Sequence, residues 1–81
     1  MTLKEFVKIF LEKNKGFKYT TQTDADGYCR VILFNFTTTI KLSSSDSKKF
    51  AANVYHIDAN SASLHLVVQI IEILKKGGYE D

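Results

Sequence analysis

The chain has 81 residues, a formal net charge of +2, 44% hydrophobic residues and 25% charged residues. This length predicts one small domain over residues 1–81 and leaves no space for a separate substrate domain. The composition excludes wholesale disorder. Domains that bind nucleic-acid phosphates usually carry a clustered excess of basic residues, and this mild net charge does not indicate one.

Cysteine content and the absence of long apolar runs favour a cytoplasmic protein. Cys29 is alone, so no intramolecular disulfide can form, whereas small secreted domains usually need several. Residues 1–5 already include charged side chains and lack the apolar region of a signal peptide. No apolar run reaches the ~20 residues needed to span a bilayer. Lysine far outnumbers arginine and proline is absent, a bias typical of AT-rich coding that favours a phage or mobile-element source.

The N-terminal segment predicts an amphipathic helix over residues 3–14. Thr2 and Glu5 have the spacing of a capping box. Apolar residues follow at helical intervals with lysines and glutamates opposite; they are Leu3, Phe6, Val7, Phe10 and Leu11. Gly16 has the left-handed preference expected just beyond a helix end, so the helix should stop there.

Three strands are predicted after this helix. Residues 17–23 alternate between the two faces of a half-buried strand, and residues 24–27 predict a hairpin turn in which Gly27 takes a positive φ. Residues 28–36 are apolar on both faces, which predicts a central strand covered on both sides. Residues 39–43 predict a third strand, and a serine-rich loop follows.

The apolar residues of segment 48–57 fit both the helical and the strand repeat. Phe50, Val54 and Ile57 have helical spacing, whereas Tyr55 and Ile57 have strand spacing. We interpret the segment as a fourth strand. The order is then helix, three- or four-stranded antiparallel sheet, helix, which is an α+β fold.

The C-terminal segment predicts the strongest helix, from Ser63 to Leu74. Asp58, Asn60 or Ser61 is expected to cap it, and the glycines at 77 and 78 to end it.

The apolar surface of this last helix is wider than one sheet requires. Its polar side chains share one narrow stripe when projected at about 100° per residue, and a helix on one sheet needs only about a 100° apolar face. The excess should meet a second copy or another protein, unless the first helix or residues 48–57 cover it. We expect the partner surface at Leu66, Ile70 and Ile73. The expected core residues are Phe6, Phe10, Val31, Leu33, Val67 and Ile71.

Motifs for catalysis or cofactor binding are lacking. His56 and His65 have no partners at a recognised metal spacing, and residues 24–27 lack the later ligands of a calcium loop. Cys29 is interpreted as a small buried hydrophobe rather than a reactive thiol. No glycine-framed nucleophile or phosphate loop occurs. We therefore expect no catalytic residue, no metal, no cofactor and no enzymatic activity.

Lysines concentrate in two segments and could contact nucleic acid weakly through phosphates. They are Lys4, Lys8, Lys15, Lys18, Lys48 and Lys49. The order helix, strands, helix resembles that of double-stranded RNA-binding domains, a resemblance that implies RNA binding. The lysine signature that opens that family's last helix is absent here, where residues 58–63 read Asp-Ala-Asn-Ser-Ala-Ser.

Two functions follow as hypotheses. The first is a non-enzymatic protein-interaction domain that regulates or inhibits a protein partner, with homodimerisation as one form of that interaction. The alternative is a nucleic-acid-binding module.

Overall fold

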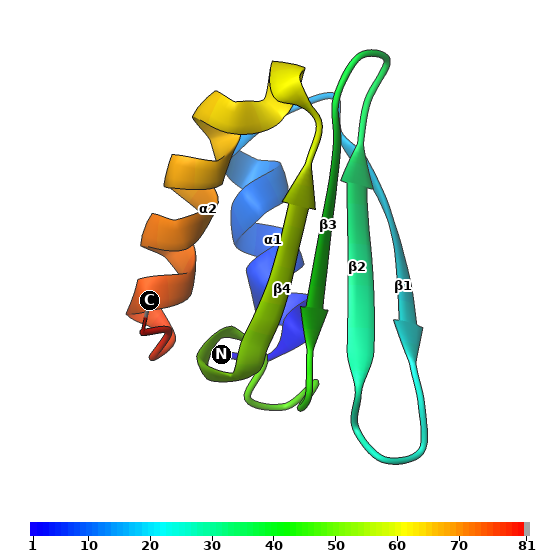
Figure 1. The fold of residues 1–81 in the computed structure, drawn as a ribbon, viewed down its shortest axis with the longest axis vertical. Coiled ribbons are helices and arrows are strands. Elements are labelled where there is room, and N and C mark those ends of the chain that lie inside the picture. The colour runs from blue at the N-terminus through cyan, green and yellow to red at the C-terminus, as the bar shows by residue number, and fades with distance from the viewer. Residues whose placement is uncertain (81) are drawn as a thin grey trace.

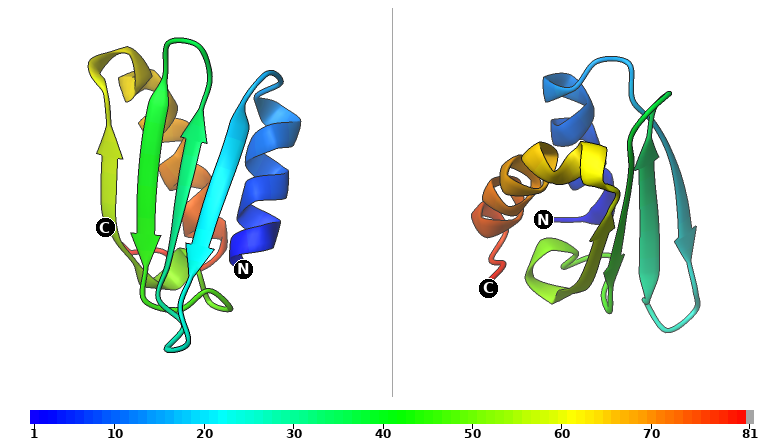
Figure 2. Two further views of the ribbon diagram at one scale, coloured as in Figure 1. Left: turned by 90° about the vertical axis from the view of Figure 1, so that its right-hand side faces the viewer. Right: turned by 45° about the horizontal axis from the view of Figure 1, so that its top comes forward.

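The computed structural model describes residues 1–80, which form an α+β fold as predicted (Figure 1). The helices are α1 (Leu3–Lys13) and α2 (Leu64–Lys76). The antiparallel strands are β1 (Lys18–Thr23), β2 (Cys29–Phe34), β3 (Thr39–Ser44) and β4 (Val54–Ala59), and they lie in the spatial order β1-β2-β3-β4. Figure 2 shows both helices on one face of the sheet, so the other face is open.

The start of α1 follows the predicted capping box. Glu5 N–H donates to Thr2 Oγ1, and Thr2 N–H donates to Glu5 Oε1, each at 3.1 Å. These hydrogen bonds, first of all the one from the Thr2 backbone, favour the carboxylate and lower the pKa of Glu5. The helix ends at Lys13 with Asn14 as its C-cap, one residue earlier than predicted.

Asparagine and aspartate side chains close both sheet hairpins beside β2. Asp24 Oδ1 accepts hydrogen bonds from the N–H groups of Asp26 and Tyr28, and Gly27 has a φ of +93°, so the predicted turn is confirmed. At the other end, Asn35 Oδ1 accepts from two following N–H groups. This Asx-type turn ends β2 at Phe34 rather than at residue 36.

The core lies between the inner face of the sheet and the two helices. The inward side chains of β2 and β3 are fully buried; they include Val31, Leu33, Ile40 and Leu42. The Phe6 ring packs between those of Phe10 and Phe50, with centroids 6.4 and 5.2 Å away. The predicted core positions in α1 and β2 are therefore confirmed.

The outer face of β2 corrects one prediction. Arg30 is exposed, and Ile32 and Phe34 are only half-buried. The strand was predicted to be covered on both sides, but both helices occupy one face, so β2 is covered on that face alone (Figure 2).

Residues 48–57 divide into two kinds of structure. The segment before Val54 is a turn that ends in a short 3-10 turn, η1 (Ala51–Asn53), and only the part from Val54 is strand. The prediction of strand is therefore wrong for residues 48–53, where the fully buried Phe50 belongs to a turn packed into the core.

The orientation of α2 also differs from the prediction. A second 3-10 turn, η2 (Ser61–Ser63), precedes the helix, and Asn14 Nδ2 of the α1 C-cap donates to Gln69 Oε1 at 2.6 Å. In this orientation Leu66, Ile70 and Ile73 point inward, and their exposed fractions are 9%, 0% and 1%, respectively. The expected partner surface is therefore part of the core, and Val67 and Ile71, expected in the core, are half-buried.

Among residues 1–80, no helix combines the length and apolar character needed to cross a membrane.

Candidate functional site

β1 has an inner face that the helices leave uncovered. Tyr19, Thr21 and Thr23 pair in register with Leu33, Val31 and Cys29, whose side chains all point into the core. Paired residues share one face of a sheet, so the three β1 side chains also point toward the helix layer. All six residues of β1 are nevertheless exposed, and 49% of Tyr19 is accessible.

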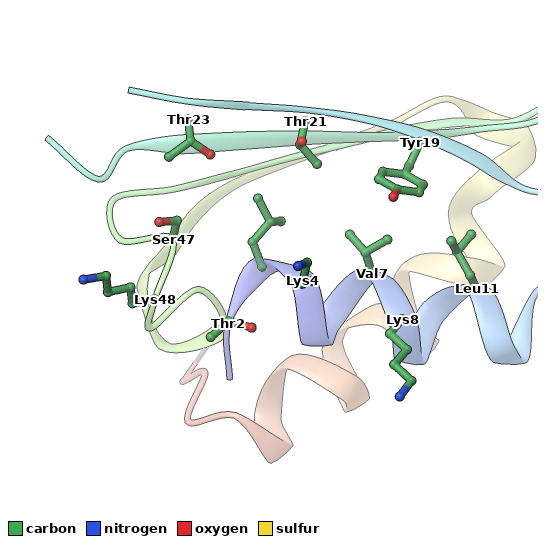
Figure 3. A pocket seen from close by; sticks show the side chains of 11 residues that line it. Thr2, Lys4, Val7, Lys8, Leu11, Tyr19, Thr21, Thr23, Ser47 and Lys48 are labelled. Carbon is green, nitrogen blue, oxygen red and sulfur yellow. The ribbon is translucent and has the colours of Figure 1, made fainter. Parts of the chain in front are cut away.

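A groove of about 470 Å³ separates this strand from α1 (Figure 3). Leu3, Val7 and Leu11 line it from the helix, and Tyr19, Thr21 and Thr23 line it from the strand. In Figure 3 the side chains of Val7 and Leu11 point toward Tyr19 and Thr21. The walls are thus aliphatic on one side and mixed aromatic and hydroxyl on the other.

Lysines border the groove. Lys4 and Lys8 from α1 and Lys48 from the segment after β3 line it, and all three are exposed. The amine of Lys8 is turned away from β1 in Figure 3, but exposed side chains change rotamer within nanoseconds. No carboxylate lies among the described residues that line the groove, so the charged side chains lining it are all cationic.

The other lysines predicted to contact nucleic acid lie outside the groove. Lys18 pairs with Phe34 at the start of β1 and lies on the opposite sheet face from Tyr19. Lys15 lies in the turn after α1, and Lys49 follows Lys48 in the turn before η1. The fold therefore brings Lys4, Lys8 and Lys48 around one groove and leaves Lys15, Lys18 and Lys49 apart from it.

The backbone of β1 adds a second feature to the groove. Asp24 N–H donates to Tyr28 O at 2.9 Å across the hairpin, which fixes this as a hydrogen-bonded pair. Such pairs alternate along antiparallel strands, so the N–H and C=O groups of Tyr19, Thr21 and Thr23 point away from β2. The strand carries no proline, and its register with β2 is continuous, so this sheet edge lacks two common forms of edge protection.

The open sheet face holds a second, smaller recess. The rings of Tyr28 and Tyr55 meet edge to face with centroids 6.4 Å apart, beside a hollow of about 250 Å³ that Arg30 and Asp24 also line. More than half of each tyrosine is exposed.

A third exposed feature runs along α2. Leu64 and Val68 are each 61% exposed, and the half-buried Val67 and Ile71 continue the same side of the helix. This stripe lies beside the one predicted from the sequence and consists of different residues.

The side chains with catalytic or metal-binding chemistry are scattered. Among residues 1–80, no three His, Cys, Asp or Glu residues are placed to hold a metal ion together. His56 is on β4 and His65 on α2. Cys29 is buried, and this burial raises the pKa of its thiol.

Comparison with known protein families, with curated proteins and with solved structures finds no match.

Proposed function

We propose that this chain is a non-enzymatic protein-interaction domain that binds a segment of a partner protein in the groove between α1 and β1. By binding such a segment, the domain would regulate or inhibit its partner. The observation that carries this proposal is an inward-directed strand face that the chain's own helices leave uncovered.

The groove has the size and lining of a binding site. Its volume of about 470 Å³ lies within the roughly 300–1,000 Å³ range of ligand sites. Leu11 and Tyr19 offer apolar surface that a partner would remove from water, at about 25 cal/mol per Å². Tyrosine is also enriched among the residues that dominate binding energy at interfaces.

The lysines add selectivity. Lys4, Lys8 and Lys48 border the groove, and like-charged partners would be repelled while acidic ones are attracted. Exposed charges of this kind act mainly on association rate and partner choice, so the apolar walls would supply most of the affinity.

A displayed library of random 12-residue peptides tests this proposal. Selection is run on the wild-type protein, on Leu11→Glu and on Phe36→Glu. Leu11 lines the groove, whereas Phe36 is fully exposed in the turn between β2 and β3, so the second variant adds the same charge elsewhere. Circular dichroism confirms that both variants fold.

We expect peptides selected on the wild type to bind Phe36→Glu equally and Leu11→Glu at least tenfold more weakly. An absence of enriched peptides, or peptides that bind both variants alike, would reject the groove as a protein-binding site.

The tyrosine pair on the open sheet face supports nucleic-acid binding as a second candidate function. Exposed aromatic rings next to an arginine form a surface on which unpaired bases stack, and Tyr28, Tyr55 and Arg30 line one recess. Asp24 lines the same recess and repels phosphate, which places this candidate second.

A further inference from the structure

We propose that the partner segment is an extended, acidic peptide that adds to the free edge of β1 as a fifth strand. This inference rests on the proposed function and specifies how the groove is filled. It joins two independent observations, the outward-pointing backbone of β1 and the lysine-bordered groove beside it.

The backbone of β1 supplies the hydrogen bonds. Tyr19, Thr21 and Thr23 direct their N–H and C=O groups away from β2, as the hairpin pairing of Asp24 with Tyr28 establishes. An added strand of about six residues would match β1 in length, because both rise about 3.4 Å per residue. Main-chain pairing of this kind gives affinity, and the pockets for alternate side chains give selectivity.

The groove receives alternate side chains of the added strand. Side chains of neighbouring strands share faces of a sheet with period two, so every second residue of the segment would point toward the flank of α1. Leu11 and Val7 meet those side chains there, which favours apolar residues at the central inward positions.

Charge complementarity defines the rest of the segment. Lys4, Lys8 and Lys48 surround the groove without a carboxylate among the described lining residues, and lysine side chains extend their amines well beyond their apolar stems. The residues between the inward ones point to the opposite face of the sheet, so carboxylates at the inward positions that flank the apolar ones would meet this lysine-bordered rim.

The same charges argue against a second copy of β1 as the occupant. The strand reads Lys-Tyr-Thr-Thr-Gln-Thr, with a cation and no carboxylate. Lys18 lies on the opposite sheet face from the groove, so pairing two such edges would direct only Tyr19, Thr21 and Thr23 of another copy toward it. These side chains offer no negative charge to the lysines that border the groove.

The probe for this inference is the synthetic peptide acetyl-Glu-Thr-Val-Thr-Val-Thr-Glu-amide, whose glutamates and valines share one face of a strand, titrated by calorimetry and by amide NMR spectra. The protein variants are Thr21→Pro and its matched control Thr21→Val. Proline at position 21 removes an N–H that points away from β2, so the ladder within the sheet is kept. Valine keeps the N–H and suits a strand.

We expect the peptide to bind the wild type and Thr21→Val with similar affinity, and Thr21→Pro at least tenfold more weakly. The largest amide shifts should fall on Tyr19, Thr21 and Thr23. A version of the peptide with lysine in place of glutamate should not bind. Two further peptides, N-methylated on the odd or on the even amides, repeat the test on unaltered protein. One of the two should bind at least tenfold more weakly than the unmethylated peptide.

Each other outcome overturns the inference in a distinguishable way. Equal binding of the peptide to Thr21→Pro and Thr21→Val, or no binding at millimolar peptide, rejects the acidic added strand. The proposed function still stands in those cases if library peptides distinguish Leu11→Glu from Phe36→Glu. A wild-type dimer in sedimentation that Thr21→Pro abolishes would assign the edge to a second copy instead.

Discussion

Burial determines the chemistry of Cys29, the first residue of β2. Its side chain is 5% exposed. Removal from water disfavours the thiolate, and this raises the pKa of the thiol above its usual value of 9.0. Because the thiolate is the reactive form, the native thiol should be a poor nucleophile at neutral pH.

We predict that an aromatic disulfide reagent modifies Cys29 at least 100-fold more slowly in the native protein than in concentrated urea, followed by absorbance at pH 8. The modification rate of the native protein should still rise with pH in the range where the modification rate of the unfolded chain has reached its plateau. Native and unfolded rates within a few-fold of each other would show that the thiol is accessible.

Gly77 illustrates a residue whose position can be predicted while its reason cannot. Glycine after the lysines of the last helix predicts a helix end, and α2 does end there. Its φ of −99° is open to any residue, but a Cβ would lie 2.6 Å from that of Ala51 and 2.7 Å from that of Met1. The requirement for glycine comes from packing between segments distant in sequence, which no local pattern contains.

The orientation of α2 is the clearest limit of prediction among the elements. The sequence correctly predicted that this helix exists and where it ends. Apolar residues cover most of its circumference, however, so periodicity alone could not identify the inward face. The hydrogen bond from Asn14 to Gln69 joins α2 to α1 across 55 residues of sequence. That contact helps to set the phase, and the helix's own sequence does not reveal it.

This orientation predicts opposite effects for neighbouring substitutions in α2. Ile70 is fully buried and Val68 is 61% exposed. Ile70→Ala should lower the free energy of unfolding by about 2–5 kcal/mol through lost burial and a cavity. Val68→Ala should change it by less than about 0.5 kcal/mol. Urea denaturation monitored by circular dichroism measures both, and the reverse ranking would show that the helix is rotated.

The strands were predictable wherever a clear alternation met a recognisable turn. Residues 17–34 satisfy both conditions, and β1 and β2 form with the expected hairpin. Before β4, the buried Phe50 belongs to a turn whose Ser44 hydroxyl donates to the Phe50 carbonyl oxygen at 2.9 Å. That long-range attachment, rather than any strand period, places Phe50 in the core.

At the scale of the whole molecule, the distribution of lysines determines any affinity for nucleic acid. Lys15, Lys18 and Lys49 do not join Lys4, Lys8 and Lys48 around the groove, and Arg30 is the single arginine of the chain. Lysines act on phosphates as point charges, whereas bidentate reading of bases relies mainly on arginine and amide side chains.

We predict that binding to duplex RNA, duplex DNA and single strands is weak, similar for all three, and falls steeply with salt because each phosphate contact releases counterions. Fluorescence anisotropy titrations at low and near-physiological salt measure this. A nanomolar, salt-resistant preference for one nucleic acid would instead favour the second candidate function.

The candidate site itself could be predicted only in part. The sequence identifies the lysines and the strand that carries Tyr19, but the groove depends on how far α1 lies from β1. One available signal was that Thr21 and Thr23 occupy inner positions where a covered strand would carry larger apolar residues. The uncovered edge follows from that weak inner face.

The exposure of all six β1 residues also bears on the dynamics of the native state. Detaching β1 would expose little apolar surface of its own, so its opening should cost far less than global unfolding, as expected for a separate cooperative unit with low protection against hydrogen exchange. The β1 amides should exchange their hydrogens through local opening, whereas the β3 amides should exchange only through global unfolding. The edge suited to receive a ligand is then also the part of the sheet that a ligand would stabilise most.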